Sequence, residues 1–239
     1  MKILILGDVH GCFGDLNIVI ARALRQHPDI TAFVQVGDFG YAWPGGEPFQ
    51  FYKTFFEDDL MTLAESIPFY WLDGNHENLD QLEKDQGAYQ PNMIYQPRGS
   101  IKSFEDRTAM FFGGASSIDK AQRIEGKSWW PQESITYRQV IDTCTNHAAL
   151  KGQIDMMFSH EFPLAFPYGS YKLEFGKGDK QALDAVREYF KPKWHFFGHH
   201  HKFEQGETDG TKWMCAPIID EMMPILFDGE DAKPLNLKR

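Results

Sequence analysis

Five short apolar segments of this 239-residue chain each end in a glycine or serine that is followed at once by side chains able to bind metal ions. The five junctions read Gly7-Asp8-Val9-His10-Gly11, Gly37-Asp38, Gly74-Asn75-His76-Glu77, Ser159-His160 and Gly198-His199-His200-His201. In an open α/β sheet, ligands bind beyond the carboxyl ends of the strands. Such a fold would therefore bring these distant junctions together at one edge.

The segments between the junctions predict an α/β fold with parallel strands. Strand, turn and helix follow one another along the first third of the chain, which is typical of parallel sheets. We expect buried strands at 1–6, 32–36, 69–72, 156–158 and 194–198, and helices at 15–26, 48–66, 132–150 and 179–190. Short apolar pieces separated by turn residues predict hairpins within 92–118.

The length and composition favour one domain over residues 1–239, with 228–239 as a loosely ordered, polar tail. No run of about 18 apolar residues exists, so no membrane span is predicted. The apolar run before Asp8 is too short for a signal peptide, and the three cysteines lack metal-ligand spacing. We therefore expect a cytoplasmic protein with reduced thiols.

The formal net charge of −10 disfavours binding to extended nucleic acid, because that affinity depends on basic surfaces. A small phosphorylated substrate is still compatible with this charge, provided that bound metal ions supply the local positive charge. The oligomeric state and the bacterial or phage source stay open.

The residue types at the junctions suit a site with two metal ions. Carboxylate and imidazole groups bind divalent ions such as manganese, iron and zinc, and the two oxygens of one aspartate can each serve one cation. Asn75 offers a neutral carbonyl oxygen. Two cations roughly 3.5–4 Å apart can activate a water molecule and neutralise a phosphoryl group during in-line displacement.

The ordered set D-x-H, G-D, G-N-H-E, a lone histidine and G-H-x-H resembles the calcineurin-like metallophosphoesterases, and the likeness spans residues 8–201. The resemblance implies a sandwich of two β-sheets flanked by helices, with a dinuclear site at one end. It also implies a role for each junction residue. Asp8, His10 and His201 would bind the first metal ion, Asn75, His160 and His199 the second, and Asp38 would bridge them. His76 would be the catalytic histidine that protonates the leaving group or steadies the phosphate.

One departure from this pattern bears on the substrate. The first and third junctions are similar to those of protein serine/threonine phosphatases, whose second motif reads G-D-x-V-D-R-G. Here that motif reads Gly37-Asp38-Phe39-Gly40-Tyr41-Ala42-Trp43, without the aspartate and the arginine. Asp73 and Glu77 are the alternative partners for His76.

Three residues are candidates for substrate contacts. Tyr41 and Trp43 follow a ligand-bearing turn, where they would either stack on a base or sugar or pack against loops. Arg123 lies in a polar, basic and aromatic segment similar to an insertion of small bacterial and phage-type members of the family. Its guanidinium would either hold a phosphate by a bidentate contact or form a surface ion pair.

The sequence thus predicts a phosphoester hydrolase with two divalent cations, manganese in first place and iron, zinc, cobalt or nickel as alternatives. A metal-activated hydroxide would attack phosphorus, Asn75 would stabilise the developing charge and His76 would assist the leaving oxygen. A phosphodiester or nucleotide-like substrate is favoured. The alternatives are a phosphomonoesterase or protein serine/threonine phosphatase, and a non-catalytic metal-binding scaffold.

Overall fold

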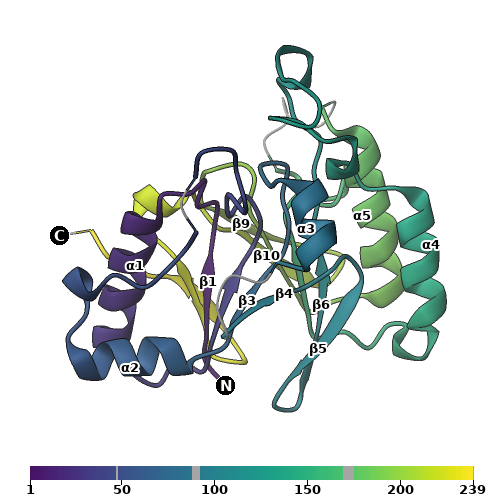
Figure 1. The fold of residues 1–239 in the computed structure, drawn as a ribbon. Coiled ribbons are helices and arrows are strands. Elements are labelled where there is room, and N and C mark those ends of the chain that lie inside the picture. Colours follow the sequence, from purple (N-terminus) through teal and green to yellow (C-terminus); the bar gives the residue numbers. More distant parts are fainter. Residues whose placement is uncertain (47, 88–91, 169–174, 239) are drawn as a thin grey trace.

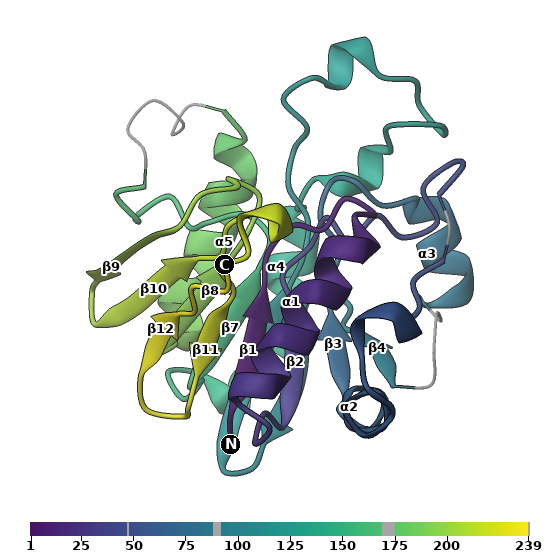
Figure 2. The same cartoon turned by 90° about the vertical axis from the view of Figure 1, so that its left-hand side faces the viewer.

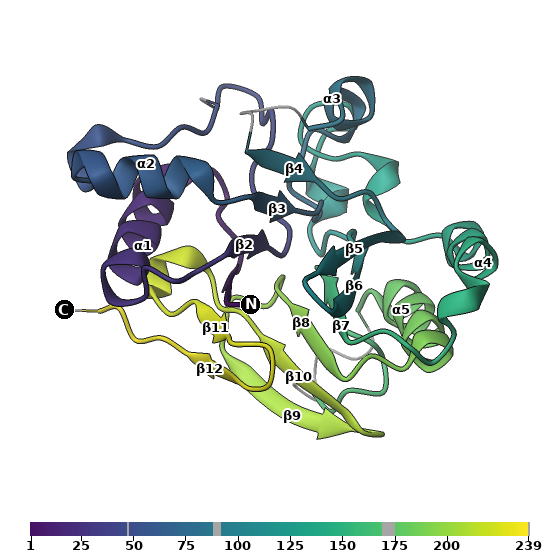
Figure 3. The same ribbon diagram turned by 90° about the horizontal axis from the view of Figure 1, so that it is seen from below.

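A computed structural model describes residues 1–46, 48–87, 92–168 and 175–238. In this part of the chain, two six-stranded sheets pack face to face, with helices on their outer surfaces (Figures 1 and 3). The strand order is β12-β11-β1-β2-β3-β4 in the first sheet and β5-β6-β7-β8-β10-β9 in the second. The expected α/β fold, a two-sheet sandwich flanked by helices, is confirmed.

The elements have the following bounds. The strands of the first sheet are β1 (Ile3–Leu6), β2 (Ala32–Gln35), β3 (Phe69–Trp71), β4 (Met93–Tyr95), β11 (Ile225–Phe227) and β12 (Ala232–Pro234). Those of the second are β5 (Ser100–Phe104), β6 (Arg107–Phe112), β7 (Met156–Ser159), β8 (Trp194–Phe197), β9 (Glu204–Thr208) and β10 (Thr211–Cys215). The α-helices are α1 (Phe13–Gln26), α2 (Asp58–Ser66), α3 (Leu79–Asp85), α4 (Tyr137–Asn146) and α5 (Lys177–Phe190), and short 3-10 helices include η2 (Lys120–Gln122) and η3 (Pro131–Glu133).

Each sheet contains four consecutive parallel strands. These are β1 to β4 in the first sheet and β6, β7, β8 and β10 in the second, and antiparallel strands complete both sheets. The predicted hairpins reduce to one, β5 with β6, because β4 pairs in parallel with β3 instead. The junctions that follow β1, β2, β3, β7 and β8 consequently lie at one end of the sandwich.

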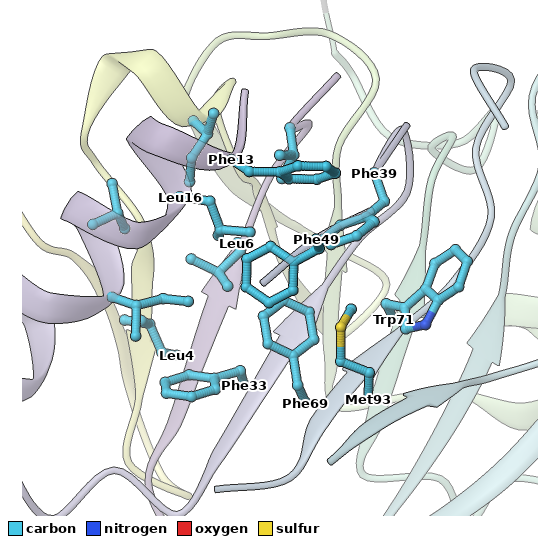
Figure 4. Packing of buried hydrophobic residues seen from close by; sticks show 14 of the residues in the cluster. Leu4, Leu6, Phe13, Leu16, Phe33, Phe39, Phe49, Phe69, Trp71 and Met93 are labelled. Atoms are coloured by element: carbon cyan, nitrogen blue, oxygen red, sulfur yellow. The ribbon is translucent and has the colours of Figure 1, made fainter. Parts of the chain in front are cut away.

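Alternation along β1 shows how the sheets build two cores. Leu4 and Leu6 point outward and pack with the buried face of α1, whereas Ile3 and Ile5 point inward and join the core between the two sheets. Figure 4 shows the outer core, in which aromatic side chains such as Phe33, Phe39 and Phe69 fill the space beside α1. A third cluster seals α4 and α5 onto the other sheet.

The prediction of a loosely ordered tail at 228–239 is wrong for the described residues up to 238. Residues 232–234 form β12, which pairs antiparallel with β11. Leu235 and Leu237 are then buried against the α1 side of the first sheet. The polar composition concealed an alternating pattern, and Pro234 fits because an edge strand need not donate a hydrogen bond there. Among the described residues, none of the helices combines the length and apolar character needed to cross a bilayer.

The segment between β6 and α4 stands above the carboxyl ends of the strands (Figures 1 and 2). A buried arginine anchors its base. Arg98 pairs with Asp73 at 2.7 Å and also donates hydrogen bonds to the backbone oxygens of Gln132, Glu133 and Ser134. Arg98 thus ties this segment to the residue that follows β3 by two positions.

We expect Arg98→Met to lower the free energy of unfolding by about 3–5 kcal/mol, because it leaves the buried carboxylate of Asp73 without its charge partner. Denaturant unfolding measures the change. Arg138→Met is the control, since Arg138 forms an exposed ion pair with Asp142 that should contribute no more than about 0.5 kcal/mol. Equal effects of the two substitutions would contradict the anchoring role.

Candidate metal centre

The structure brings the predicted metal-binding residues together above the two sheets. Three of them, Asp8, His10 and His201, form one group whose ligand atoms lie within 4.8 Å of one another. Asp38, His160 and His199 form a second such group. Asp38 also belongs to a third group, with His10 and His76, so it lies between the first two.

Both aspartates hold the backbone with Oδ1 and turn Oδ2 toward His10. Asp8 Oδ1 accepts the N–H of His199, and Asp38 Oδ1 accepts the N–H groups of Asn75 and His76. Oδ2 of each aspartate lies 3.7 Å from His10 Nε2. Asp8 is completely buried, yet its Oδ2 has no well-formed hydrogen bond from any described residue, although His201 Nε2 is 3.1 Å away.

The glycines at the junctions allow this close approach. A Cβ atom on Gly74 would collide with the carboxylate of Asp38, and one on Gly198 would collide with that of Asp8. The ligands themselves carry backbone strain. His10, Asp38, His199 and His201 all have positive φ values, between 49° and 65°, which residues other than glycine rarely adopt. Such strain clusters at functional sites, where the surrounding structure must hold it.

His160 shows what the two carboxylates demand. Its Nδ1 donates to the backbone oxygen of Val36, so Nε2 faces Asp38 at 3.3 Å and Asn75 Oδ1 at 3.2 Å. Burial alone would lower the pKa of His160, but the charge and hydrogen bond of Asp38, together with Asp8, raise the pKa to about 10. The carboxylates of Asp38 and Asp8 therefore stabilise positive charge at His160 Nε2.

The residues present fit two divalent cations. Buried carboxylate oxygens, imidazole nitrogens turned toward them and a side-chain carbonyl form a donor set typical of such ions. A neutral His160 and the oxygen of Asn75 would both present lone pairs to each other, and a shared cation reconciles them. His160 also has the outer hydrogen bond that usually orients a metal-bound histidine.

His76 does not pair with either of the acids considered as its partner. Asp73 is held by Arg98 and by the hydroxyl of Tyr95. Glu77 is buried and accepts the N–H groups of Phe39, Gly40 and Gly74. The partner of His76 is instead Arg123, whose Nη2 lies 2.8 Å from His76 Nε2.

The geometry of this pair defines the role of each group. A guanidinium only donates, so His76 Nε2 accepts the hydrogen bond. Burial lowers the pKa of His76, and the charges of His10 and Arg123 add to this effect against that of Asp38. Arg123 Nε is in turn held at 2.7 Å by Asp119. The segment between β6 and α4 thereby places the positively charged guanidinium of Arg123 beside His76.

Two cavities meet at His76. The first, of about 350 Å³, is lined by ligand residues, by Arg123 and, on its far wall, by Glu161 and Lys180. The second, of about 270 Å³, is lined by His76, Trp43, His10 and Gly11, among others. The ring of Trp43 lies 5.5 Å from that of His76.

Tyr41 and Trp43 have different environments. Tyr41 is buried, stacks on Trp71 at 5.2 Å and donates its hydroxyl to Asp85. Its ring belongs to the outer core, which is the packing alternative considered for Tyr41. The stack on Trp71 of β3 and the hydrogen bond to Asp85 hold the Tyr41 side chain there. Trp43, in contrast, lines the second cavity.

Sequence reasoning missed a buried ionic cluster beside the ligands. Glu161 follows His160 and contacts His200 Nε2 at 2.7 Å and Lys180 Nζ at 3.0 Å. Burial would raise the pKa of Glu161, but the hydrogen bond and charge of His200, with His199 and Lys180, hold it well below its usual range. The position of Glu161 directly after a ligand was the available signal. His200, which lies between the candidate ligands His199 and His201, belongs to this cluster.

Aspartates and histidines from both sheets lie together at one edge of the sandwich, as in a metalloenzyme. The model of calcineurin-like phosphoesterases matches residues 1–203, and the chain belongs to this family. Family membership supports metal-dependent hydrolysis of phosphoesters, and the family typically uses a dinuclear divalent metal centre. A comparison with curated proteins finds no match.

Solved structures share the fold at low sequence identity. The protein TT1561 of Thermus thermophilus is 12% identical, with a TM-score of 0.61 over 99% of each chain. A dimetal phosphatase from Danio rerio is 12% identical, with a TM-score of 0.58 over 98% of this chain and 95% of its own. The anchor GAP50 in the inner membrane complex of Plasmodium is 14% identical, with a TM-score of 0.54 over 100% of this chain and 89% of its own.

We expect Glu77→Gln to lower the free energy of unfolding of metal-free protein by about 1–3 kcal/mol, because an amide cannot accept backbone N–H groups at both of its ends. Chemical denaturation measures this change. Glu65→Gln, on the exposed face of α2, should stay within about 0.5 kcal/mol of wild type. Wild-type stability of the Glu77 variant would show that its carboxylate does not hold the junctions together.

Proposed function

We propose that this protein hydrolyses small phosphodiesters, nucleotide-like ones in particular, with two divalent cations of which manganese is the first candidate. The observation that carries the substrate class is that two cavities meet at His76. A phosphodiester has a substituent on each side of phosphorus, and each cavity can hold one. Trp43 gives the second cavity an aromatic wall on which a planar group can stack.

In this proposal Asp8, His10 and His201 hold one cation, Asn75, His160 and His199 hold the other, and Asp38 contacts both. The grouping of the ligand atoms supports the assignment, because Asp38 shares groups with His10 and with His160. When bound, the two cations supply the positive charge that polarises a phosphoryl group and lowers the pKa of a water nucleophile.

The other residues bind the substrate and move a proton. His76 lies beside Asp38 and His10, where, once Arg123 has turned from its Nε2 to the phosphate, a protonated His76 can donate to the departing ester oxygen. Arg123 offers its guanidinium to the phosphate oxygens from the wall of the first cavity. Asp119 holds that guanidinium through Nε, Nη1 donates to the backbone oxygen of Ser128, and Nη2 is directed toward the site.

A phosphomonoesterase, including a protein serine/threonine phosphatase, is the second candidate, and Arg123 is the observation that favours it. An arginine beside His76 provides charge for the additional negative oxygen of a monoester. The third candidate is a non-catalytic scaffold, since the related fold of GAP50 belongs to an anchor. The complete donor set and the buried Oδ2 of Asp8, which faces the imidazoles of His10 and His201, argue for metal binding.

The test uses metal-stripped protein to which manganese is added back. We expect wild type to bind two ions and to hydrolyse bis-p-nitrophenyl phosphate faster than p-nitrophenyl phosphate. His76→Ala should reduce kcat by about 10²–10⁴-fold because it removes the proton donor, while the bound manganese stays at two ions.

The control is His147→Ala, which lies at the end of α4 and should behave as wild type. Loss of one manganese ion in His76→Ala would instead identify His76 as a ligand. Faster cleavage of the monoester would favour the phosphatase, and absence of turnover in metal-loaded wild type would favour the scaffold.

Trp43 tests the second cavity. We expect Trp43→Ala to raise the KM for bis-p-nitrophenyl phosphate about tenfold, because stacking of a planar group contributes about 1–3 kcal/mol. Trp43→Phe should retain most of the affinity. Steady-state kinetics with dimethyl phosphate as competing inhibitor provide the comparison, since its methyl groups cannot stack. An equal loss of affinity for both compounds would argue against a stacking subsite.

A further inference from the structure

The side chain of Asn75 poses a problem of orientation. Its amide oxygen can bind a cation, but its NH2 group cannot, and the two ends have nearly the same shape. An amide that turns the wrong way would present two N–H donors to the centre. A neighbouring group must therefore distinguish the two ends chemically.

A buried pair of residues in the segment above the strands provides this distinction. Asn75 Nδ2 donates to Ser117 Oγ at 3.1 Å. The hydroxyl of Ser117 donates to Glu133 Oε2 at 2.6 Å, and its backbone N–H donates to Glu133 Oε1 at the same distance. All three residues are buried, with exposed fractions of 4% for Asn75, 0% for Ser117 and 1% for Glu133.

The direction of these hydrogen bonds follows from the number of hydrogens available. A carboxylate only accepts, so the one hydroxyl hydrogen of Ser117 is committed to Glu133. Ser117 Oγ then offers only lone pairs to Asn75, and the amide NH2 is the end that suits them. The amide oxygen consequently turns to the opposite side, where it lies 3.2 Å from His160 Nε2.

We propose that Ser117 and Glu133 are positioning residues that fix the amide of Asn75 with its oxygen toward the metal centre. The inference rests on the proposed metal centre but not on the choice between diester and monoester. It assigns a role to the segment between β6 and α4 beyond that of supplying Arg123.

Arg98 holds Glu133 in place, and Glu133 in turn holds Ser117 and Asn75. Arg98 donates to the backbone oxygens of Gln132 and Glu133 and pairs with Asp73, two residues before Asn75. Asn75 is thus held on one side through its own strand end and on the other through Ser117. Glu133 lies in η3, a single turn that this arginine holds in place.

The test measures manganese binding to metal-stripped protein by isothermal titration calorimetry. We expect Ser117→Ala to weaken the second bound ion by about 10–100-fold and to leave the first nearly unchanged, because only the second is assigned to Asn75. Ser117→Thr keeps the hydroxyl and should recover the affinity to within about threefold. Glu133→Gln should weaken the same ion, because an amide NH2 facing Ser117 competes for its lone pairs and frees its hydrogen to turn toward Asn75.

Ser116→Ala is the matched control. Ser116 is the preceding residue and donates its hydroxyl to the buried Asp179, but it does not contact Asn75 among the hydrogen bonds of the described residues. Thermal unfolding of the metal-free variants separates loss of fold from loss of binding. Wild-type affinity in both Ser117→Ala and Glu133→Gln, or an equal loss in Ser116→Ala, would overturn the inference. Wild type that binds fewer than two ions would overturn the proposed metal centre itself.

Discussion

Two buried aspartates set the conditions for everything around them. Asp8 and Asp38 are almost entirely removed from solvent, and each anchors one oxygen on backbone N–H groups of the neighbouring junctions. Burying two carboxylates so close together is costly unless positive charge compensates them. The raised pKa of His160 is one sign of this demand, and the donor set that fits two cations is the other. The strained backbone at the ligands is tolerated because these contacts hold it.

The two sheets contribute different parts of the site. The first provides the aspartates, Asn75 and His76 after β1, β2 and β3, and the second provides His160, His199 and His201 after β7 and β8. Neither of the two groups assigned to the metal ions is complete within one sheet, because His201 joins Asp8 and His10, and Asp38 joins His160 and His199. The core between the sheets, which Ile3, Ile5 and Phe158 help to fill, therefore determines the geometry of the metal centre as well as the stability of the fold.

The segment between β6 and α4 places an arginine beside His76, whereas the second motif lacks the arginine found in protein serine/threonine phosphatases. Arg123 comes to His76 from this segment instead of from the loop after β2. Asp73 and Glu77, the nearest acids in sequence, are committed to Arg98 and to backbone N–H groups. The side chain that contacts His76 thus comes from a loop more than 40 residues further along the chain.

The sequence alone determined the order of the strands' ends and the identity of the ligand candidates, because glycine-aspartate and glycine-histidine junctions after apolar runs are local signals. It also determined the burial of α1, whose apolar face repeats with helical spacing.

Local patterns did not reveal β12, since an edge strand of mixed polarity resembles a loop until a partner strand pairs with it. They did not separate Tyr41 from Trp43, two residues apart, because only packing against Trp71 decides which ring enters the core. Nor did they indicate Ser117, Glu133, Glu161 or Lys180, which acquire partners from distant parts of the chain. Only the tertiary structure decided these roles, because a hydrogen bond or ion pair between residues tens of positions apart exists only once the two sheets have packed.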